Sequence, residues 1–275
     1  MGMCRGRMEG MADPMDAVRT FDAASDDYDR FRPGYPEELY RAIFDYVDLG
    51  PSSALVEVGI GTGQATPPFL DLGCAVTAVE PGEHLARVCR EKFARWPRFR
   101  VIVGRFEEAD LPGSAFDLVY AATAFHWVPE AAGYRRAFAM LKPGGAFARF
   151  ANHPCRAGDD PELSAALDEV YARYYYPWHG KAPASPRPCG QEQARAMADI
   201  AGKYGFVDLR WALFHRRRRF TAKEYRALLG TYSDHAAIEP GVREKFFSAI
   251  ESAILDYGGT ITIEDTIDLQ LARRP

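Results

Sequence analysis

The sequence predicts an α/β fold with a doubly wound, mostly parallel sheet of seven strands and helical insertions that cap it. Between residues 54 and 150, five short apolar runs alternate with helical stretches, as in βαβ units around a parallel sheet. Near the C-terminal end, two further segments place apolar residues at every second position, as strands with one buried face do. A proline-interrupted stretch separates the two sets. Its frequent prolines are typical of an insertion rather than of the core.

Each expected strand is a short segment. In chain order, the strands are 54–58, 75–79, 99–103, 116–122, 146–150, 207–213 and 261–271. The predicted domain organisation is a flexible tail at 1–20, a ligand-binding core at 21–152, a helical insertion or lid at 153–204, and the end of the core sheet at 205–275 with a second helical insertion at 221–257.

The expected helices carry start signals and apolar faces. Pro36 is followed by two glutamates, and proline suits a first helical position while acids suit the positive end of the helix dipole. Thr221 and Glu224 have the spacing of a capping box. A helical piece at 163–175 and an amphipathic helix at 242–254 complete the predicted insertions. The buried face of the first helix is expected to hold Leu39, Ile43, Phe44 and Val47.

Composition and charge argue against nucleic-acid-binding, membrane-spanning and secreted proteins. The 275 residues are 47% apolar with a net charge of -4 and a pI near 5.9, which gives no overall basic field for nucleic acid. No apolar run is long enough for a membrane span, and the start lacks the apolar stretch of a secretion signal. We therefore expect a cytoplasmic monomer or homodimer that acts on a small molecule and binds neither nucleic acid nor membrane.

The cysteines and one run of arginines are candidates for further sites. The cysteines are odd in number and form no CxxC pair, so reduced thiols and no metal site are expected. They are Cys4, Cys74, Cys89, Cys155 and Cys189. Residues 216–219 are four arginines, but strand alternation sends half to each face, which favours a solvated edge over a binding patch.

A glycine loop follows the first core strand. Gly59, Gly61 and Gly63 permit positive φ and let backbone amides approach a ligand. A dinucleotide fingerprint requires a third glycine where Gln64 stands, which disfavours a nicotinamide oxidoreductase and favours a nucleoside without a pyrophosphate. Glu80, at the end of the second strand, could accept both ribose hydroxyls or could merely cap the following helix.

With these motifs, the sequence resembles the class I S-adenosylmethionine-dependent methyltransferases of Rossmann-like fold, type 11, in the branch around trans-aconitate methyltransferase. The resemblance covers nearly the whole chain and depends on the order and spacing of five pieces. These are Glu57-Val58-Gly59-Ile60-Gly61-Thr62-Gly63, Glu80-Pro81, Phe106-Glu107, Phe116-Asp117-Leu118-Val119 with Ala124-Phe125-His126-Trp127, and Leu141-Lys142-Pro143-Gly144-Gly145.

The resemblance implies a donor site for S-adenosylmethionine. Glu57 and the loop glycines would hold the methionine end, although Glu57 could instead pair with a buried arginine. Phe106 and Glu107 would lie beside the adenine, with Glu108 as an alternative acceptor. The remaining implied donor contacts are Tyr28, Arg32, Glu80, Ala122 and Ala124.

The acceptor side is implied less directly. His126 follows the fourth strand, where doubly wound sheets place ligands, and is the candidate base for a hydroxyl or amine acceptor. A carboxylate acceptor would need no base. The implied acceptor contacts are Tyr35, Trp127, Tyr232 and Ser233. The expected activity is methyl transfer to a small molecule, and the alternative is a regulatory protein that binds S-adenosylmethionine without transfer.

Overall fold

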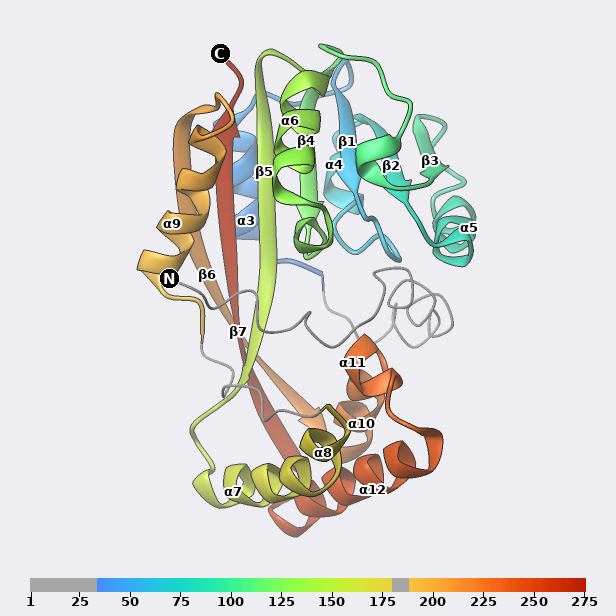
Figure 1. The fold of residues 1–275 in the computed structure, drawn as a ribbon, viewed down its shortest axis with the longest axis vertical. Helices are drawn as coiled ribbons and strands as arrows, with labels where there is room; N and C mark the ends of the chain where they lie inside the picture. The colour runs from blue at the N-terminus through green and yellow to red at the C-terminus, as the bar shows by residue number, and fades with distance from the viewer. Residues whose placement is uncertain (1–33, 180–187) are drawn as a thin grey trace. The chain divides into compact units, whose positions relative to one another are not determined.

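The computed structural model describes residues 34–179 and 188–275 (Figure 1). The chain divides into two compact units. The sheet unit contains the described residues of 33–153, 189–215 and 266–275, and the helical unit contains those of 154–188 and 216–265.

Seven strands form one sheet in the order β3-β2-β1-β4-β5-β7-β6 (Figure 1). β1 pairs in parallel with β2 and β4, β2 with β3, and β4 with β5. The predicted fold class, a mostly parallel seven-stranded sheet, is therefore confirmed. The strands are β1 Ala54–Val58, β2 Ala75–Glu80, β3 Phe99–Val103, β4 Phe116–Ala122, β5 Leu141–Arg156, β6 Val207–Thr221 and β7 Thr260–Arg273.

β5 and β6 are longer than the apolar runs that predict them. β5 has 16 residues, whereas the sequence predicts 146–150, and β6 has 15 residues, whereas the sequence predicts 207–213. Both extensions carry polar side chains, among them Asn152 and His153 in β5. Apolar periodicity marks only the stretch of a strand that faces a core, so it misses these ends.

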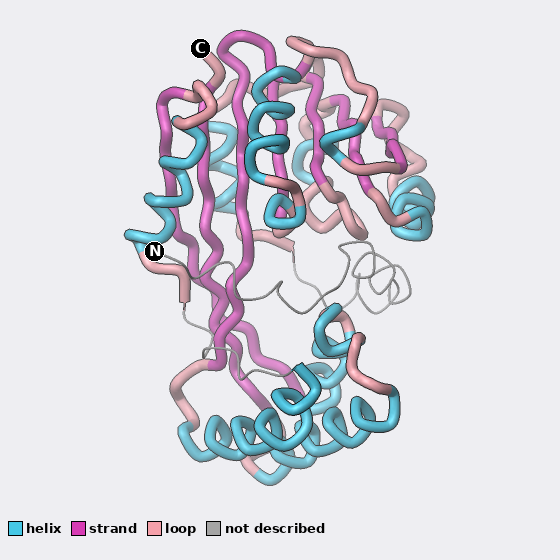
Figure 2. The backbone as a smooth tube through the Cα atoms, in the orientation of Figure 1, coloured by secondary structure: helices cyan, strands magenta, loops and turns pink. Residues whose placement is uncertain are grey.

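Helices of the sheet unit cover both faces of the sheet (Figure 2). Along β1, Leu55 faces a core that includes residues of α3, α4 and α5, whereas Val56 and Val58 face a core that includes residues of α6 and α9. This alternation is the doubly wound arrangement. The helices are α3 Glu37–Tyr46, α4 Pro67–Asp71, α5 Glu83–Lys92, α6 Glu130–Met140 and α9 Gln191–Gly202, with 3-10 turns η1 Phe106–Glu108 and η2 Phe125–Trp127.

The first described helix begins one residue later than predicted. Pro36 has an extended ψ of 149° and precedes α3 as its N-cap, so it is not the first helical residue. The predicted buried positions Leu39, Ile43 and Val47 are buried, whereas Phe44 is only partly buried.

The helical unit has its own core, which includes Leu167, Leu228, Phe246 and Ile263. The predicted capping box is confirmed, because Thr221 accepts from the Glu224 N–H and Glu224 accepts from the Thr221 N–H. The helices of this unit are α7 Pro161–Val170, the π-helix η3 Tyr171–Tyr175, α8 Tyr176–His179, α10 Ala222–Gly230, α11 Ser233–Ala236 and α12 Pro240–Asp256. None of the described helices combines the length and apolarity that a membrane crossing requires.

The four arginines of β6 alternate as predicted, but they are not simply solvated. Arg216 and Arg218 both donate to the carboxylate of Asp265, which is fully buried. Arg217, on the opposite parity, pairs with Asp159. The expected solvated edge therefore holds for Arg217 and Arg219, which are exposed on the edge strand β6, whereas Arg216 and Arg218 are partly buried against Asp265.

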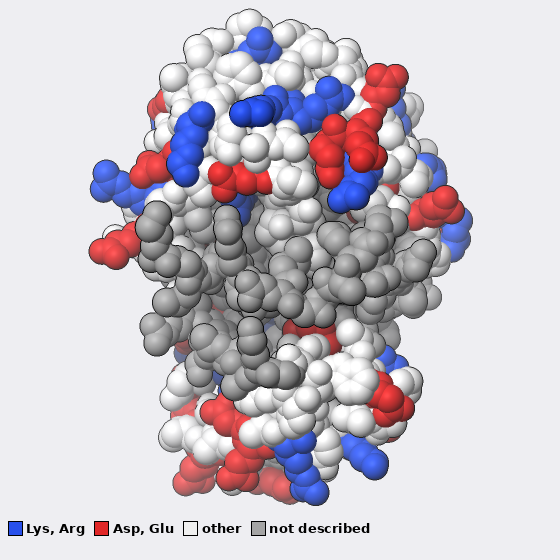
Figure 3. All heavy atoms as spheres, in the orientation of Figure 1, with Lys and Arg blue, Asp and Glu red and all other residues white. Residues whose placement is uncertain are grey.

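Figure 3 shows basic and acidic side chains interspersed on the visible face of each unit.

Candidate functional site

The three loop glycines after β1 all adopt left-handed backbone angles. Their φ values are +64° at Gly59, +59° at Gly61 and +81° at Gly63, a region that side chains other than glycine disfavour. The Gly59 N–H donates to the carbonyl of Val79 at 2.8 Å, which joins the loop to the end of β2. The backbone, rather than side chains, therefore forms this turn.

The glycines differ in what surrounds them. A Cβ on Gly59 would lie 2.7 Å from the Cβ of Ala124, and one on Gly63 would lie 2.4 Å from the ring of Phe93. Both positions need glycine for close packing. A Cβ on Gly61 would have no atom of the described residues within 4 Å, so this backbone borders space that a ligand could reach.

Glu80 ends β2 and is buried, with 5% of its surface exposed. Its carboxylate accepts from the Gly61 N–H and from the Gly82 N–H, each at 2.9 Å. One carboxylate oxygen thus holds the glycine loop, and the other holds Gly82, the N-cap residue of α5. The sequence predicts a carboxylate at this strand tip but gives no signal for its bond to Gly61.

Glu57 lies within β1, with 1% of its surface exposed. The hydroxyls of Thr66 and Tyr120 donate to its Oε2, each at 2.7 Å. Burial raises the pKa of Glu57 from 4.5 to about 7, the nearby Glu80 carboxylate also raises it, and the two hydroxyl bonds oppose the rise. The carboxylate of Glu57 is thus held by two hydroxyls, where the sequence also allowed a buried arginine.

Tyr120 is a site residue that the sequence does not single out. It lies in register with Glu57 on the neighbouring strand β4 and is fully buried. Strand pairing between β1 and β4 brings the two together, and that pairing is set by the sheet order rather than by proximity in the chain.

The turn after β4 holds a second unpredicted residue. Thr123 has φ +52°, a rare and strained angle for a β-branched residue. Its hydroxyl shares a hydrogen bond with the Tyr35 hydroxyl at 2.7 Å and accepts from the Asn152 N–H at 3.2 Å. Thr123 stands between Ala122, which ends β4, and Ala124, which lies against Gly59. Its strained backbone angle therefore forms the turn that leads from β4 to Ala124, beside the glycine loop.

Next along the chain, the η2 turn presents His126 and Trp127. The buried Phe125 packs its ring at 5.1 Å from Tyr134 and 5.0 Å from Phe147, which anchors the turn. His126 is exposed and its ring lies 5.1 Å from that of the partly buried Trp127.

The η1 turn follows β3. Phe106 is 4% exposed and packs in the core that includes Val79, while Glu107 accepts from Arg105 at 3.1 Å and Glu108 is exposed. The Phe106 ring is thus mainly a core contact, and Glu107 and Glu108 carry the accessible polar side-chain groups of this turn.

The last four predicted residues are not among the described residues of the sheet unit. Tyr28 and Arg32 lie outside the described residues. Tyr232 belongs to the helical unit, partly buried, with its ring 5.6 Å from that of His235. Ser233 begins α11, and its side chain lies outside what the structure describes.

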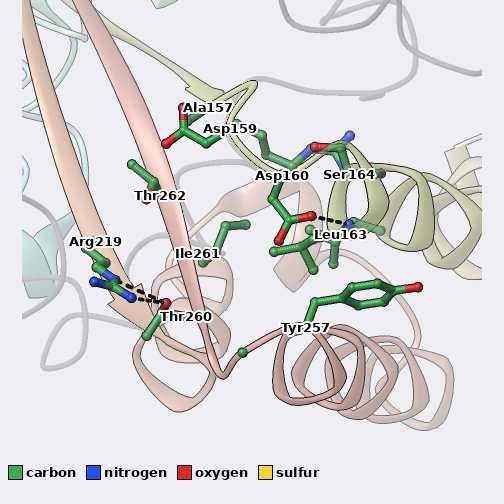
Figure 4. Close-up of a pocket in the computed structure, with 13 residues that line it drawn as sticks. Ala157, Asp159, Asp160, Leu163, Ser164, Arg219, Tyr257, Thr260, Ile261 and Thr262 are labelled. Atoms are coloured by element: carbon green, nitrogen blue, oxygen red, sulfur yellow. Dashed lines mark hydrogen bonds between the residues drawn. The ribbon is translucent and has the colours of Figure 1, made fainter.

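An open pocket of about 420 Å³ lies within the helical unit (Figure 4). Asp160 in its wall accepts from the Leu163 N–H at 2.8 Å, and Arg219 donates to the Thr260 hydroxyl at 2.9 and 3.1 Å. These polar groups already serve the fold of the unit. The pocket is not lined by the glycine loop.

Comparison with known proteins finds a family match for the part of the chain that contains the glycine loop. Residues 56–148 match a family model described as a methyltransferase domain. These residues are therefore similar to a methyltransferase domain. The match begins inside β1 and ends inside β5, so this domain contains the glycine loop, Glu80 and both 3-10 turns.

Relatives extend the likeness beyond this methyltransferase domain. An uncharacterized methyltransferase of Schizosaccharomyces pombe is 23% identical over 86% of this chain and 87% of its own. One from Mycobacterium tuberculosis is 32% identical over 47% of this chain and 51% of its own.

Among solved structures, a protein of Anaeromyxobacter dehalogenans, provisionally described as a type II methyltransferase, has a TM-score of 0.61 at 24% identity. It covers 88% of this chain and 98% of its own. Haemonchus contortus phosphoethanolamine N-methyltransferase 2, solved with S-adenosylhomocysteine, has a TM-score of 0.55 at 16% identity, over 96% of this chain and 59% of its own. At these identities, the likeness shows a shared fold.

Proposed function

We propose that this protein transfers a methyl group from S-adenosylmethionine to a small-molecule acceptor. The observation that carries the proposal is the Gly61 backbone, which borders open space while the Glu80 carboxylate holds it in place. A bare backbone with positive φ next to a buried acid, at the carboxyl ends of β1 and β2, suits an amino-acid nucleoside.

The donor contacts follow from this arrangement. The loop at Gly59, Gly61 and Gly63 receives the methionine end, and Glu57 supplies negative charge behind it. Because Glu57 is buried and bonded to the hydroxyls of Thr66 and Tyr120, it acts through these two bonds and, when ionised above its raised pKa, through its charge rather than by direct contact.

Other proposed contacts surround the nucleoside. Glu80 accepts the ribose hydroxyls, which requires it to share oxygens that now accept backbone amides. The η1 turn with Phe106 and Glu107 flanks the adenine. Ala122 and Ala124 line the turn after β4, and Tyr28 and Arg32 from the N-terminal segment complete the proposed donor site.

The bound donor supplies an electrophilic methyl group on a positively charged sulfur. The task of the chain is to align an acceptor with that group and to exclude water. Tyr35 and Trp127 are the proposed acceptor contacts of the sheet unit. Tyr232 and Ser233 belong to the helical unit, and their role stays a prediction from the sequence resemblance.

The acceptor is proposed to be a carboxylate or a hydroxyl compound, in line with a place in the trans-aconitate methyltransferase branch. A carboxylate is ionised at neutral pH and needs only cationic or hydrogen-bonding neighbours. A hydroxyl must lose a proton, and the exposed imidazole of His126 is the proposed base.

The test combines binding with transfer. Calorimetric titration with S-adenosylhomocysteine measures donor-site occupancy, and transfer of an isotope-labelled methyl group to a panel of carboxylates, hydroxyl compounds and amines is followed by mass spectrometry. We expect binding at one site per chain and label on at least one acceptor. Binding without any labelled product would favour the regulatory alternative, and NADH binding without donor binding would overturn the proposal.

A further inference from the structure

Three side chains with metal-binding atoms come together in the sheet unit, and none of them belongs to the glycine loop. His153 lies in β5, Asp268 lies in β7, and Cys189 immediately precedes Gly190, the N-cap of α9. One ligand atom from each residue lies within 4.8 Å of those of the other two. We propose that His153, Cys189 and Asp268 bind a zinc ion.

The charge of Asp268 supports a bound cation. Its side chain is fully buried, and its carboxylate is bonded to the His153 imidazole at 2.7 Å and to the Gln270 amide. Within the described part of the chain, no lysine or arginine nitrogen forms an ion pair with it. A buried carboxylate bonded only to an amide and a neutral imidazole is costly, and a divalent cation offsets that cost.

Gln270 provides a second, independent observation. It is 5% exposed, and its Nε2 donates to Asp268. Its Oε1 is buried and has no hydrogen-bond partner among the described residues. Buried oxygens are rarely left in this state, and a bound ion or an ordered water is the usual explanation. The unsatisfied oxygen belongs to the amide that lies against the proposed ligand.

The ligand set favours zinc over other divalent cations. A thiolate, an imidazole and a carboxylate are all zinc ligands, whereas calcium and magnesium prefer oxygen alone. Ligand atoms around one tetrahedral zinc lie about 3.5 Å apart. The three ligand atoms here lie within 4.8 Å of one another, so small side-chain shifts would bring them to the distances that zinc requires. Binding releases the Cys189 thiol proton and replaces the bond between His153 and Asp268 with bonds to the metal.

The sequence gives no signal for this group, because its members come from three separate segments. The expectation of no metal site depended on the lack of paired cysteines, and this group uses a single cysteine. An ion bound here would join β5, β7 and the start of α9. It would therefore stabilise the fold whether or not the domain transfers methyl groups.

The experiment uses the full chain, expressed with zinc in the medium, freed of any affinity tag and dialysed against metal-free buffer. Inductively coupled plasma mass spectrometry measures zinc per chain in the wild type, Cys189→Ser, Asp268→Asn and the control Cys74→Ser. Cys74 is also a buried thiol of the sheet unit but lies outside the group. We expect about one zinc per chain in the wild type and control, and at least a tenfold loss in both ligand variants.

A measurement on the wild type alone guards against misfolded variants. After zinc is exchanged for Co²⁺, a thiolate ligand gives an intense near-ultraviolet charge-transfer band, and tetrahedral geometry gives visible absorption. Both signals are expected. Wild-type protein without zinc and without these bands would overturn the proposal, as would a folded Cys189→Ser variant that retains zinc at the wild-type level.

Discussion

The Gly61 N–H donates to the Glu80 carboxylate at 2.9 Å, across 19 residues of sequence. This bond links the turn after β1 to the tip of β2, so the two elements proposed to hold opposite ends of the donor are held together by one side chain. A substitution at either residue therefore tests both the turn and the ligand.

Glu80→Ala is expected to weaken binding of S-adenosylhomocysteine by at least about tenfold, or about 1.4 kcal/mol. The variant loses the ribose acceptor and the support of two backbone amides. Calorimetric titration provides the measurement, and Glu91→Ala, an exposed acid of α5, serves as the control. Unchanged affinity in Glu80→Ala would remove Glu80 from the donor site.

Gly61→Ala is expected to lower donor affinity by at least about tenfold while reducing stability by only about 1 kcal/mol. Its φ is +59°, and a Cβ would meet no atom within 4 Å in the part of the chain that the structure describes, so the added methyl group would occupy the proposed ligand space. Gly144→Ala is the matched control, because Gly144 has φ +79° and the same open surroundings. Equal effects of the two variants on affinity would contradict the proposed donor position.

Glu57→Gln is expected to flatten the pH dependence of stability between about pH 4.5 and 7. The folded-state pKa of Glu57 is raised to about 7, so the folded protein holds a proton that the unfolded chain releases near pH 4.5. The Glu57 contribution is therefore fully present below pH 4.5 and is lost as pH rises through 7.

The size of this Glu57 effect is on the order of 3 kcal/mol over that interval. Urea unfolding of the wild type and Glu57→Gln at several pH values measures it. Parallel stability curves for the two proteins would show that the carboxyl titrates normally in the fold.

His126→Ala distinguishes the two acceptor classes. With a hydroxyl or amine acceptor, we expect kcat to fall about 100-fold, because the base is lost, while the Kd of the donor stays unchanged. With a carboxylate acceptor, kcat is expected to change less than about twofold. His84→Ala, a histidine of α5, controls for the loss of an imidazole. A large fall with a carboxylate acceptor would contradict the proposed role of His126.

Asp265→Asn is expected to destabilise the helical unit by about 3–5 kcal/mol. Asp265 is fully buried and accepts from both Arg216 and Arg218, so neutralising it leaves two guanidinium groups without their counter-charge. Asp159→Asn, which removes the exposed partner of Arg217, should change stability by less than about 0.5 kcal/mol. Urea unfolding measures both, and similar small effects would show that the buried pairs contribute little.

By itself, the sequence determined the fold class, the positions of the strands and the glycine turn. Local chemistry settles these features: apolar runs mark the buried parts of strands, and positive φ at Gly59, Gly61 and Gly63 requires glycine. The capping box of α10 is equally local, because Thr221 and Glu224 bond within three residues.

Only the tertiary structure decided which side chains meet. Tyr120 reaches Glu57 because β4 lies beside β1, Arg218 reaches Asp265 across 47 residues, and His153 meets Asp268 across 115. Such pairings depend on sheet order and on the direction in which each side chain leaves its strand. Neither property is encoded in the spacing of residues along the chain, because burial and partner choice arise only when distant segments pack.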